Sequence, residues 1–366
     1  MTTLADILRQ YGTHYLAKLG SRVLPSHKRV MQDLTRCRTP EMGGQTWYCQ
    51  TCGDYHYSYH SCRNRHCPKC QNERTTEWLD RQRERLLPLP YFMATVTVPE
   101  GLREILRSHQ KVMYSIFFRT SAEAIQALAQ DRRFIGGTIG MIGVLQTWTR
   151  ALAYHPHIHF LIPGCGISEN GKKLRPAKKD FLMHVKPLSV LIRAKFHHAC
   201  KKTGLYNQIP QSVWKQNWVV HIEPVGNGEA ALKYLAPYLF RVAISDRNIL
   251  SLRQGQVTFR YKDSKTNQLR TCTLDALEFI RRFLQHVLPK GLVKVRYFGF
   301  LSTKKRKFLE KVKELLGMLF DPIKKIAEKA SKPFCCPRCQ KPMVFIGELP
   351  PRRGPPGTVS LHAASF

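Results

Sequence analysis

Two histidines in the stretch Tyr154–Pro163, which reads YHPHIHFLIP, are spaced for metal binding. His157 and His159 flank one apolar residue, and apolar residues continue the alternation after them. In an extended strand successive side chains point to opposite faces, so both imidazoles leave one face while the apolar residues enter the core. Two neutral imidazoles hold a hard ion such as magnesium or manganese only together with further ligands. The pattern predicts a half-open metal site on a buried strand.

The other ligands of this site stay open. His155 precedes the pair, but Pro156 interrupts the alternation, so we expect the ring of His155 to turn away. His221 and Glu223 alternate onto one face of another expected strand, over residues 217–224. We expect that strand to lie beside the first, which makes both residues possible further ligands. The alternative for the two central histidines is an exposed strand face without metal.

Two tyrosines are candidate nucleophiles. Tyr234 and Tyr238 are four residues apart in a segment expected to be helical from about residue 228, and this spacing puts both phenols on one face. A phenol has a pKa of about 10, so it attacks a phosphodiester only where a metal ion or an imidazole activates it. Attack would leave a 5′-phosphotyrosyl link and a free 3′-OH. Alternatively, both rings continue an apolar stripe, and Pro237 can kink or end the helix between them.

Four cysteines form two Cys-x-x-Cys pairs. Cys49 and Cys52 make one pair and Cys67 and Cys70 the other, and together they predict the tetrahedral ligand set of a structural zinc site. Four buried free cysteines are the alternative. Five nearby residues have three alternative roles: they form a second metal site, replace one of the four cysteines, or only make local hydrogen bonds. They are Cys62, His66, Cys37, His56 and His60. Near the C-terminus, Cys335, Cys336 and Cys339 make a partial knuckle.

The net charge of the chain indicates the kind of molecule that it binds. The chain has 59 Lys and Arg against 25 Asp and Glu, a formal net charge of +34, spread along its 366 residues. Such a surface favours a polyanion, most economically nucleic acid. The N-terminal residues lack the pattern of an export signal, and no apolar run is long enough to span a bilayer, so we expect a cytoplasmic protein without membrane contact. No phosphate-binding loop is present, which argues against a nucleotide cofactor.

The elements that must position these residues alternate in type. Strands are expected at 91–98, 136–148, 154–163, 217–224 and 257–261, and helices within 5–35, 101–130, 187–203, 274–287 and 303–330. Prolines at 88 and 90 mark a boundary. The expected domains are a helical and zinc-binding DNA-recognition domain (1–88), a nuclease domain (89–265), a basic C-terminal region (266–348) and a disordered tail (349–366).

Four segments together resemble a known family. The run SCRNRHCPKCQ, the strand HPHIHF, then YLAPYLFRVAIS and EFIRRFLQHVLPKGLVKVRYFGFL are similar, in this order, to the rolling-circle insertion-sequence transposases of bacteria, which are HUH endonucleases. The resemblance covers about residues 5–345. It implies an α+β fold, in which a ferredoxin-like antiparallel sheet carries the HUH strand beside an N-terminal zinc-binding module and a basic helical C-terminal region. His157 and His159 match the family's metal ligands, and Tyr234 and Tyr238 its tyrosine pair.

The resemblance implies a function. A transposase of this kind nicks and transfers single-stranded DNA through a covalent 5′-phosphotyrosyl intermediate, with a His-bound magnesium or manganese ion and a structural zinc. Its partners would be single-stranded DNA at the element ends and target DNA, within the bacterial nucleoid. Two alternatives remain: a plasmid replication initiator or relaxase with the same chemistry, and a non-enzymatic zinc-containing DNA-binding protein.

Overall fold

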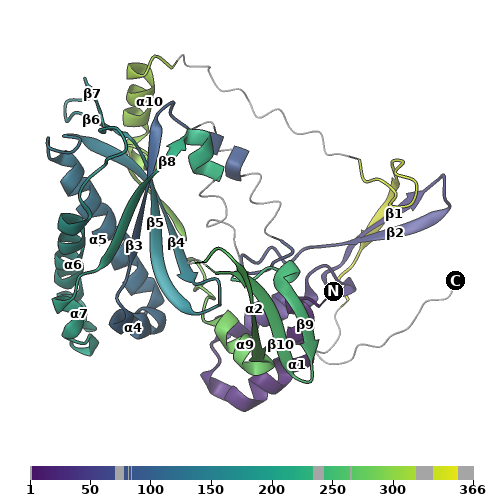
Figure 1. The fold of residues 1–366 in the computed structure, drawn as a ribbon. Coiled ribbons are helices and arrows are strands. Elements are labelled where there is room, and N and C mark those ends of the chain that lie inside the picture. The colour runs from purple at the N-terminus through teal and green to yellow at the C-terminus, as the bar shows by residue number, and fades with distance from the viewer. Residues whose placement is uncertain are drawn as a thin grey trace.

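The computed structural model describes residues 2–70, 78–80, 82–83, 85–233, 243–263, 266–318 and 333–352. Its elements form a central sheet with a layer of helices, a second body of helices and a small sheet, and an arm that carries a third sheet (Figure 1). The α+β class is therefore confirmed, with an antiparallel sheet as its main feature. None of the helices in these ranges has the length and apolar character needed to cross a membrane.

The central sheet has seven strands. Its middle part follows the order β4-β5-β3-β8, and all these neighbours are antiparallel. In chain order the elements run β3, α5, β4, β5, α6 and β8, which is the βαββαβ pattern of ferredoxin-like folds. The strands are β3 (Pro90–Thr97), β4 (Thr138–Trp148), β5 (Tyr154–Pro163), β6 (Cys165–Ile167), β7 (Leu174–Pro176), β8 (Val219–Asn227) and β12 (Val295–Gly299).

Helices cover one face of this sheet, as Figure 1 shows for α5 and α6. Ile158, Phe160 and Ile162 alternate along β5 into the core beneath these helices and are fully buried. These are the residues of the strand that the alternating sequence pattern predicts to face the core. The layer consists of α4 (Arg103–Ser108), α5 (Gln110–Gln130), α6 (Val185–Lys201) and α7 (Ser212–Lys215).

Among the described residues, the opposite face of the sheet is covered at one end. There Met93 and Leu161 pack against Ala231 and Leu232, which belong to a helical segment over residues 228–233. Phe300 joins this core from the end of β12, and α10 (Arg306–Leu315) packs beside it. The start of the expected tyrosine helix therefore lies on the same face of the sheet as the side chains of His157 and His159.

A second body combines both halves of the chain. It contains α1 (Leu4–Leu19), α2 (Pro25–Arg36), α9 (Ala276–Leu284) and a three-stranded sheet of β9 (Ile249–Arg253), β10 (Gln256–Lys262) and β11 (Leu269–Asp275). Ile7, Leu34, Phe259 and Phe279 share one buried core. The sequence predicts α1, α2 and α9 but divides them between the first and third expected domains. Long-range packing groups them instead.

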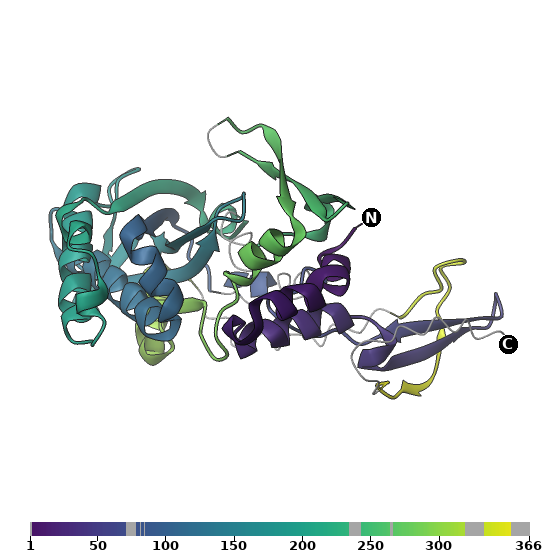
Figure 2. The same cartoon turned by 90° about the horizontal axis from the view of Figure 1, so that it is seen from below.

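The arm carries the third sheet, which has three strands in the order β13-β1-β2. β1 (Gly44–Cys49) and β2 (Asp54–Tyr59) form a hairpin, and β13 (Val344–Leu349) pairs antiparallel with β1. In Figure 2 the arm projects beyond α1 and α2, away from the central sheet. The expected division at residue 266 is thus wrong for this strand, which completes an N-terminal sheet. The expected tail is ordered through Leu349, and its residues 353–366 lie outside the described ranges.

Candidate active site and cysteine clusters

His157 and His159 lie side by side on β5, on the face that the helix layer leaves uncovered. Their ring centroids are 4.8 Å apart, and only 9% and 7% of their surfaces are exposed. The Nδ1 of His157 is 2.7 Å from the backbone oxygen of His155, which can only accept, so Nδ1 carries the hydrogen and Nε2 keeps its lone pair. The Nδ1 of His159 is 2.9 Å from Oγ1 of Thr95 on β3.

Burial keeps both imidazoles neutral. It lowers the pKa of His157 to about 4 and that of His159 to about 3, where the nearby His157 and Lys294 add to the effect. A neutral imidazole is the form that binds a metal ion. The pair is therefore in the correct protonation state for metal binding at neutral pH.

A cavity of about 570 Å³ opens in front of the two histidines. One wall is the central sheet, through Gln146 and both imidazoles, and the opposite wall comes from residues 243–245, from Arg247 and Asn248, and from β10. Four basic side chains line it, and none of its described lining residues is acidic: Arg150, Arg247, Arg260 and Lys262. Arg150 also joins the walls, because its Nη1 donates to the backbone oxygen of Lys262 at 3.1 Å. The cavity suits an anionic ligand.

Gln146 adds an oxygen atom to this site. It is directly opposite His157 in the β4–β5 pair, so both side chains point to the same face. Its Nε2 donates to the backbone oxygen of Trp148 at 3.0 Å, whereas its Oε1 is buried and has no hydrogen-bond partner among the described residues. A buried amide oxygen without a partner is costly unless a ligand satisfies it.

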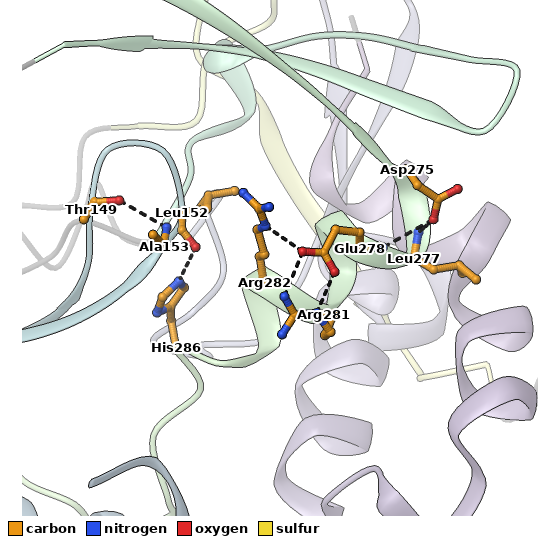
Figure 3. A network of polar contacts seen from close by, with 9 residues as sticks. All are labelled: Thr149, Leu152, Ala153, Asp275, Leu277, Glu278, Arg281, Arg282 and His286. Atoms are coloured by element: carbon orange, nitrogen blue, oxygen red, sulfur yellow. Dashed lines mark hydrogen bonds and ion pairs between the residues drawn. The ribbon is translucent and has the colours of Figure 1, made fainter. Parts of the chain in front are cut away.

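The turn before the HUH strand is fixed from the second body. His286 follows α9, and its Nε2 donates to the backbone oxygen of Leu152 at 3.3 Å (Figure 3). Its Nδ1 is 3.3 Å from Oγ1 of Thr147. Asp275 caps α9, and Glu278 pairs with both Arg281 and Arg282 on that helix. The contacts of His286 hold the β4–β5 hairpin, and with it the histidines, against the second body, whereas those of Asp275 and Glu278 lie within α9.

The cysteines form two separate clusters. In the first, here called the core cluster, Cys37, Cys62, Cys67 and Cys70 bring their sulfur atoms within 4.8 Å of one another. Hydrogen bonds from the thiols of Cys62 and Cys67 hold the pKa of Cys37 well below its usual range. The second, here called the arm cluster, consists of Cys49, Cys52, Cys336 and Cys339 within the same limit.

Sequence comparisons agree with both parts of this architecture. A family model described as "Putative transposase" matches residues 140–307, and one described as "Transposase zinc-binding domain" matches residues 7–98. A protein of Sinorhizobium fredii named "Putative transposase y4qJ" is 35% identical, over 86% of this chain and 84% of the relative. The chain belongs to this family of transposases.

A second relative is less similar but matches over a larger share of the chain. The "Transposase for insertion sequence element IS801" of Pseudomonas savastanoi pv. phaseolicola is 28% identical, over 93% of this chain and 88% of the relative. No solved structure matches the chain. The expected relationship to insertion-sequence transposases is confirmed, and the protein is a transposase that acts on DNA and carries a zinc-binding domain.

The expected grouping of cysteines in this transposase is wrong. Cys49 and Cys52 do not share a site with Cys67 and Cys70; each pair belongs to a different cluster. The reason is the hairpin β1–β2, which carries the first pair into the arm, whereas Cys67 and Cys70 pack into the core of the second body with Cys37. Cys62 lies in the core cluster, as one of the open alternatives has it.

His66 lies outside both clusters. Its Nε2 accepts from the backbone N–H of Leu288 at 3.3 Å, and the adjacent Arg65 donates to the backbone oxygens of Leu292 and Pro289 at 2.7 and 2.9 Å. The loop after Cys62 is thus hydrogen-bonded to the chain segment that leads into β12. His66 acts as a local hydrogen-bonding residue, another of the open alternatives.

The expectation that the strand of His221 and Glu223 lies beside β5 is also wrong. β3 lies between them: Thr95 pairs with His159 on one side and with His221 on the other. The backbones of His159 and His221 are therefore two strand spacings apart, or about 10 Å. His221 and Glu223 share the open face and are 3.4 Å apart. Among the described residues, their ligand atoms do not form a group with those of His157 and His159 within the 4.8 Å that the cysteine clusters satisfy.

Tyr234 and Tyr238 lie outside the described residues. The residues on either side of their segment are described: Ala231 and Leu232 pack on the open face of the central sheet, and Ala243 and Ile244 line the cavity of the histidines. Sequence reasoning missed Gln146 and the basic residues of β10. A single glutamine on an apolar strand has no spacing that would mark it as functional.

Proposed function

We propose that this transposase is a metal-dependent tyrosine DNA endonuclease and strand transferase, which nicks and transfers single-stranded DNA at the ends of its element. The observation that carries the proposal is the cavity that His157 and His159 share with basic side chains of β10. A scissile phosphate in this cavity would meet a metal-binding pair on one wall and positive charge on the other.

Magnesium or manganese is the proposed catalytic ion. His157, through its Nε2, and His159 would hold it, and the unpartnered Oε1 of Gln146 is our candidate for the third protein ligand. Amide oxygen suits such hard ions, and imidazole nitrogen holds them together with oxygen ligands. When bound, the ion supplies a positive charge that polarises the scissile phosphate.

The basic wall would orient the DNA backbone. Arg247 and Arg260 lie together, because the Nη2 of Arg260 donates to the backbone oxygen of Arg247 at 3.2 Å. Guanidinium groups bind phosphate oxygens in a fixed geometry, so the wall can hold a strand in register with the histidines. Binding of this kind weakens steeply with added salt.

Tyr234 and Tyr238 are the proposed nucleophiles. The phenol oxygen attacks phosphorus, the bond from phosphorus to the 3′ oxygen breaks, the phenol loses its proton and the departing 3′ oxygen gains one. The products are a 5′-phosphotyrosyl link and a free 3′-OH. Attack of another 3′-OH on this link reverses the bond exchange and joins a new strand. One phosphoester bond replaces another in each step, so no nucleotide is required. The helical segment 228–233 on the open face supports this assignment.

A covalent adduct tests the proposal. Full-length protein is incubated with single-stranded end sequence and manganese, and denaturing gels are examined for protein-linked DNA. A 3′-labelled strand should migrate with the protein, while a 5′-labelled fragment should be released with a free 3′-OH. Tyr234→Phe combined with Tyr238→Phe should abolish the adduct, and Tyr55→Phe, which removes an exposed hydroxyl in the arm, should not. No adduct with wild type, or equal adduct with the double variant, refutes the covalent route.

The histidines have a separate test. Replacing His157 and His159 by Ala should lower nicking at least about 10³-fold, because the phosphate loses the polarising ion. Salt-dependent DNA binding should stay nearly unchanged, and Mn²⁺ binding measured by calorimetry should disappear. Gln146→Ala should weaken Mn²⁺ binding, whereas Gln146→Glu should retain it. Parallel loss of DNA binding and nicking would indicate a folding role for the histidines instead.

A further inference from the structure

The arm cluster is built from two knuckles with the same backbone geometry. In the first, the N–H of Gly53 donates to the oxygen of Cys49 at 2.8 Å; in the second, the N–H of Gln340 donates to the oxygen of Cys336 at 2.8 Å. The residue after each knuckle has a positive φ, +71° at Gly53 and +60° at Gln340. A left-handed residue is costly for a side chain such as glutamine, so the second turn is held by its surroundings.

The sulfur atoms of this cluster have the spacing of ligands around one ion. Zinc binds thiolate sulfur at about 2.3 Å, which places the sulfurs of a tetrahedral site about 3.8 Å apart. The sulfurs of Cys49 and Cys339 are 3.6 Å apart, and those of all four cysteines lie within 4.8 Å of one another. The N–H of Cys52 also points to the sulfur of Cys49 at 3.4 Å.

The arm has almost no apolar core to hold these sulfurs together. Its buried cluster among the described residues consists of Cys49, Cys336 and Met343, so two of its three members are ligand candidates. The strands also expose large side chains, including Tyr55 and Phe345. Modules this small usually need metal or disulfides for a stable fold.

We propose that the arm cluster binds a second structural zinc ion, which joins residues 44–59 to residues 333–352 and completes the zinc-binding module with a knuckle from the far end of the chain. The match to the zinc-binding domain ends at residue 98 and thus contains only half of these ligands. Four thiolates in a tetrahedron also suit iron–sulfur clusters, but a cluster needs wider sulfur spacing than a single ion does. The transposase therefore binds two zinc ions, one in each cysteine cluster.

Elemental analysis of the purified, reduced full chain tests this inference. Wild type should contain two zinc ions per chain, and Cys336→Ser combined with Cys339→Ser should contain one. Cys335→Ser is the matched control, because Cys335 is adjacent and exposed, and its sulfur donates to the oxygen of Pro333 instead of joining the cluster. This control should keep both ions.

A conservative variant covers the case in which the serine variant does not fold. Cys339→His keeps four ligands, so it should retain two metal ions and change the absorption spectrum of one of the two sites after substitution with Co²⁺. One zinc ion per wild-type chain, iron in place of zinc, two ions in the Cys336→Ser/Cys339→Ser variant, or a Co²⁺ spectrum unchanged by Cys339→His overturns the inference. These readouts do not depend on nicking activity.

Discussion

The central sheet and the arm are both antiparallel sheets, but they are held together by different means. In the central sheet, Phe160 and Leu161 face opposite sides of β5, and both are fully buried. In the arm, half or more of the surface of Tyr55 and of Tyr57 is exposed. Apolar burial of about 25 cal/mol per Å² stabilises the first sheet, whereas the second has little such area to bury. Metal binding is therefore expected to stabilise the arm.

The difference also separates two uses of metal. In the central sheet, apolar burial stabilises the fold without metal. The same burial keeps His157 and His159 neutral, and their side chains face an open cavity. In the arm the four cysteines would fill all the positions of the proposed zinc ion, as in structural zinc sites, which leave no open position. On these proposals the same chain would contain an open site suited to chemistry and a closed site suited to folding.

The largest expected effect separates the two sheets. Cys49→Ser combined with Cys52→Ser should unfold the arm, because metal binding supplies its folding free energy. Hydrogen exchange followed by mass spectrometry should then show near-complete loss of protection in β1, β2 and β13, with β3, β4 and β5 unchanged. Cys335→Ser should leave both regions protected. Persistent protection of the arm would show that it folds without its ion.

A smaller effect concerns acid and the contact between the central sheet and the second body. Burial lowers the pKa of His286 to about 4 from its ordinary 6.5, so between these values the unfolded chain binds a proton that the folded chain excludes. The stability that this residue contributes is complete above about pH 7 and is lost as the pH falls. Between pH 7 and pH 5 the loss should be about 2 kcal/mol, from the linkage relation.

Urea unfolding at the two pH values measures this loss. His286→Gln can still donate to Leu152 and accept from Thr147 but does not titrate. The variant should therefore lose about 2 kcal/mol less than wild type between pH 7 and pH 5. An equal loss in both proteins would mean that other groups cause the acid sensitivity.

The smallest expected effect concerns the basic wall of the cavity. Arg260→Ala should lower the slope of log K against log salt concentration for single-stranded DNA by about 1, because one phosphate contact is lost. Arg133→Ala is the matched control, because Arg133 is paired with Asp131 at the turn after α5 and does not line the cavity. Equal slopes for wild type and Arg260→Ala would place the DNA elsewhere.

Local patterns in the sequence predicted much of this molecule. Alternation along residues 154–163 gives both the strand and the face on which His157 and His159 lie, because the side-chain period of a strand is two. The spacing within each Cys-x-x-Cys pair likewise predicts a knuckle, because it is a local pattern within a few residues. Strands β9, β11 and β12 were missed, since short strands with polar residues lack a distinct period.

Only the tertiary structure decided which local units meet. Cys52 is close in sequence to Cys67 but shares its cluster with Cys336 and Cys339, because β13 pairs with β1. Gln146 faces His157 through the register of β4 and β5, and β3 separates His221 from His159. The sequence by itself determined which residues can bind metal and which way a strand turns them. Strand order and pairing register depend on contacts between distant segments, and these determine which ligands share an ion.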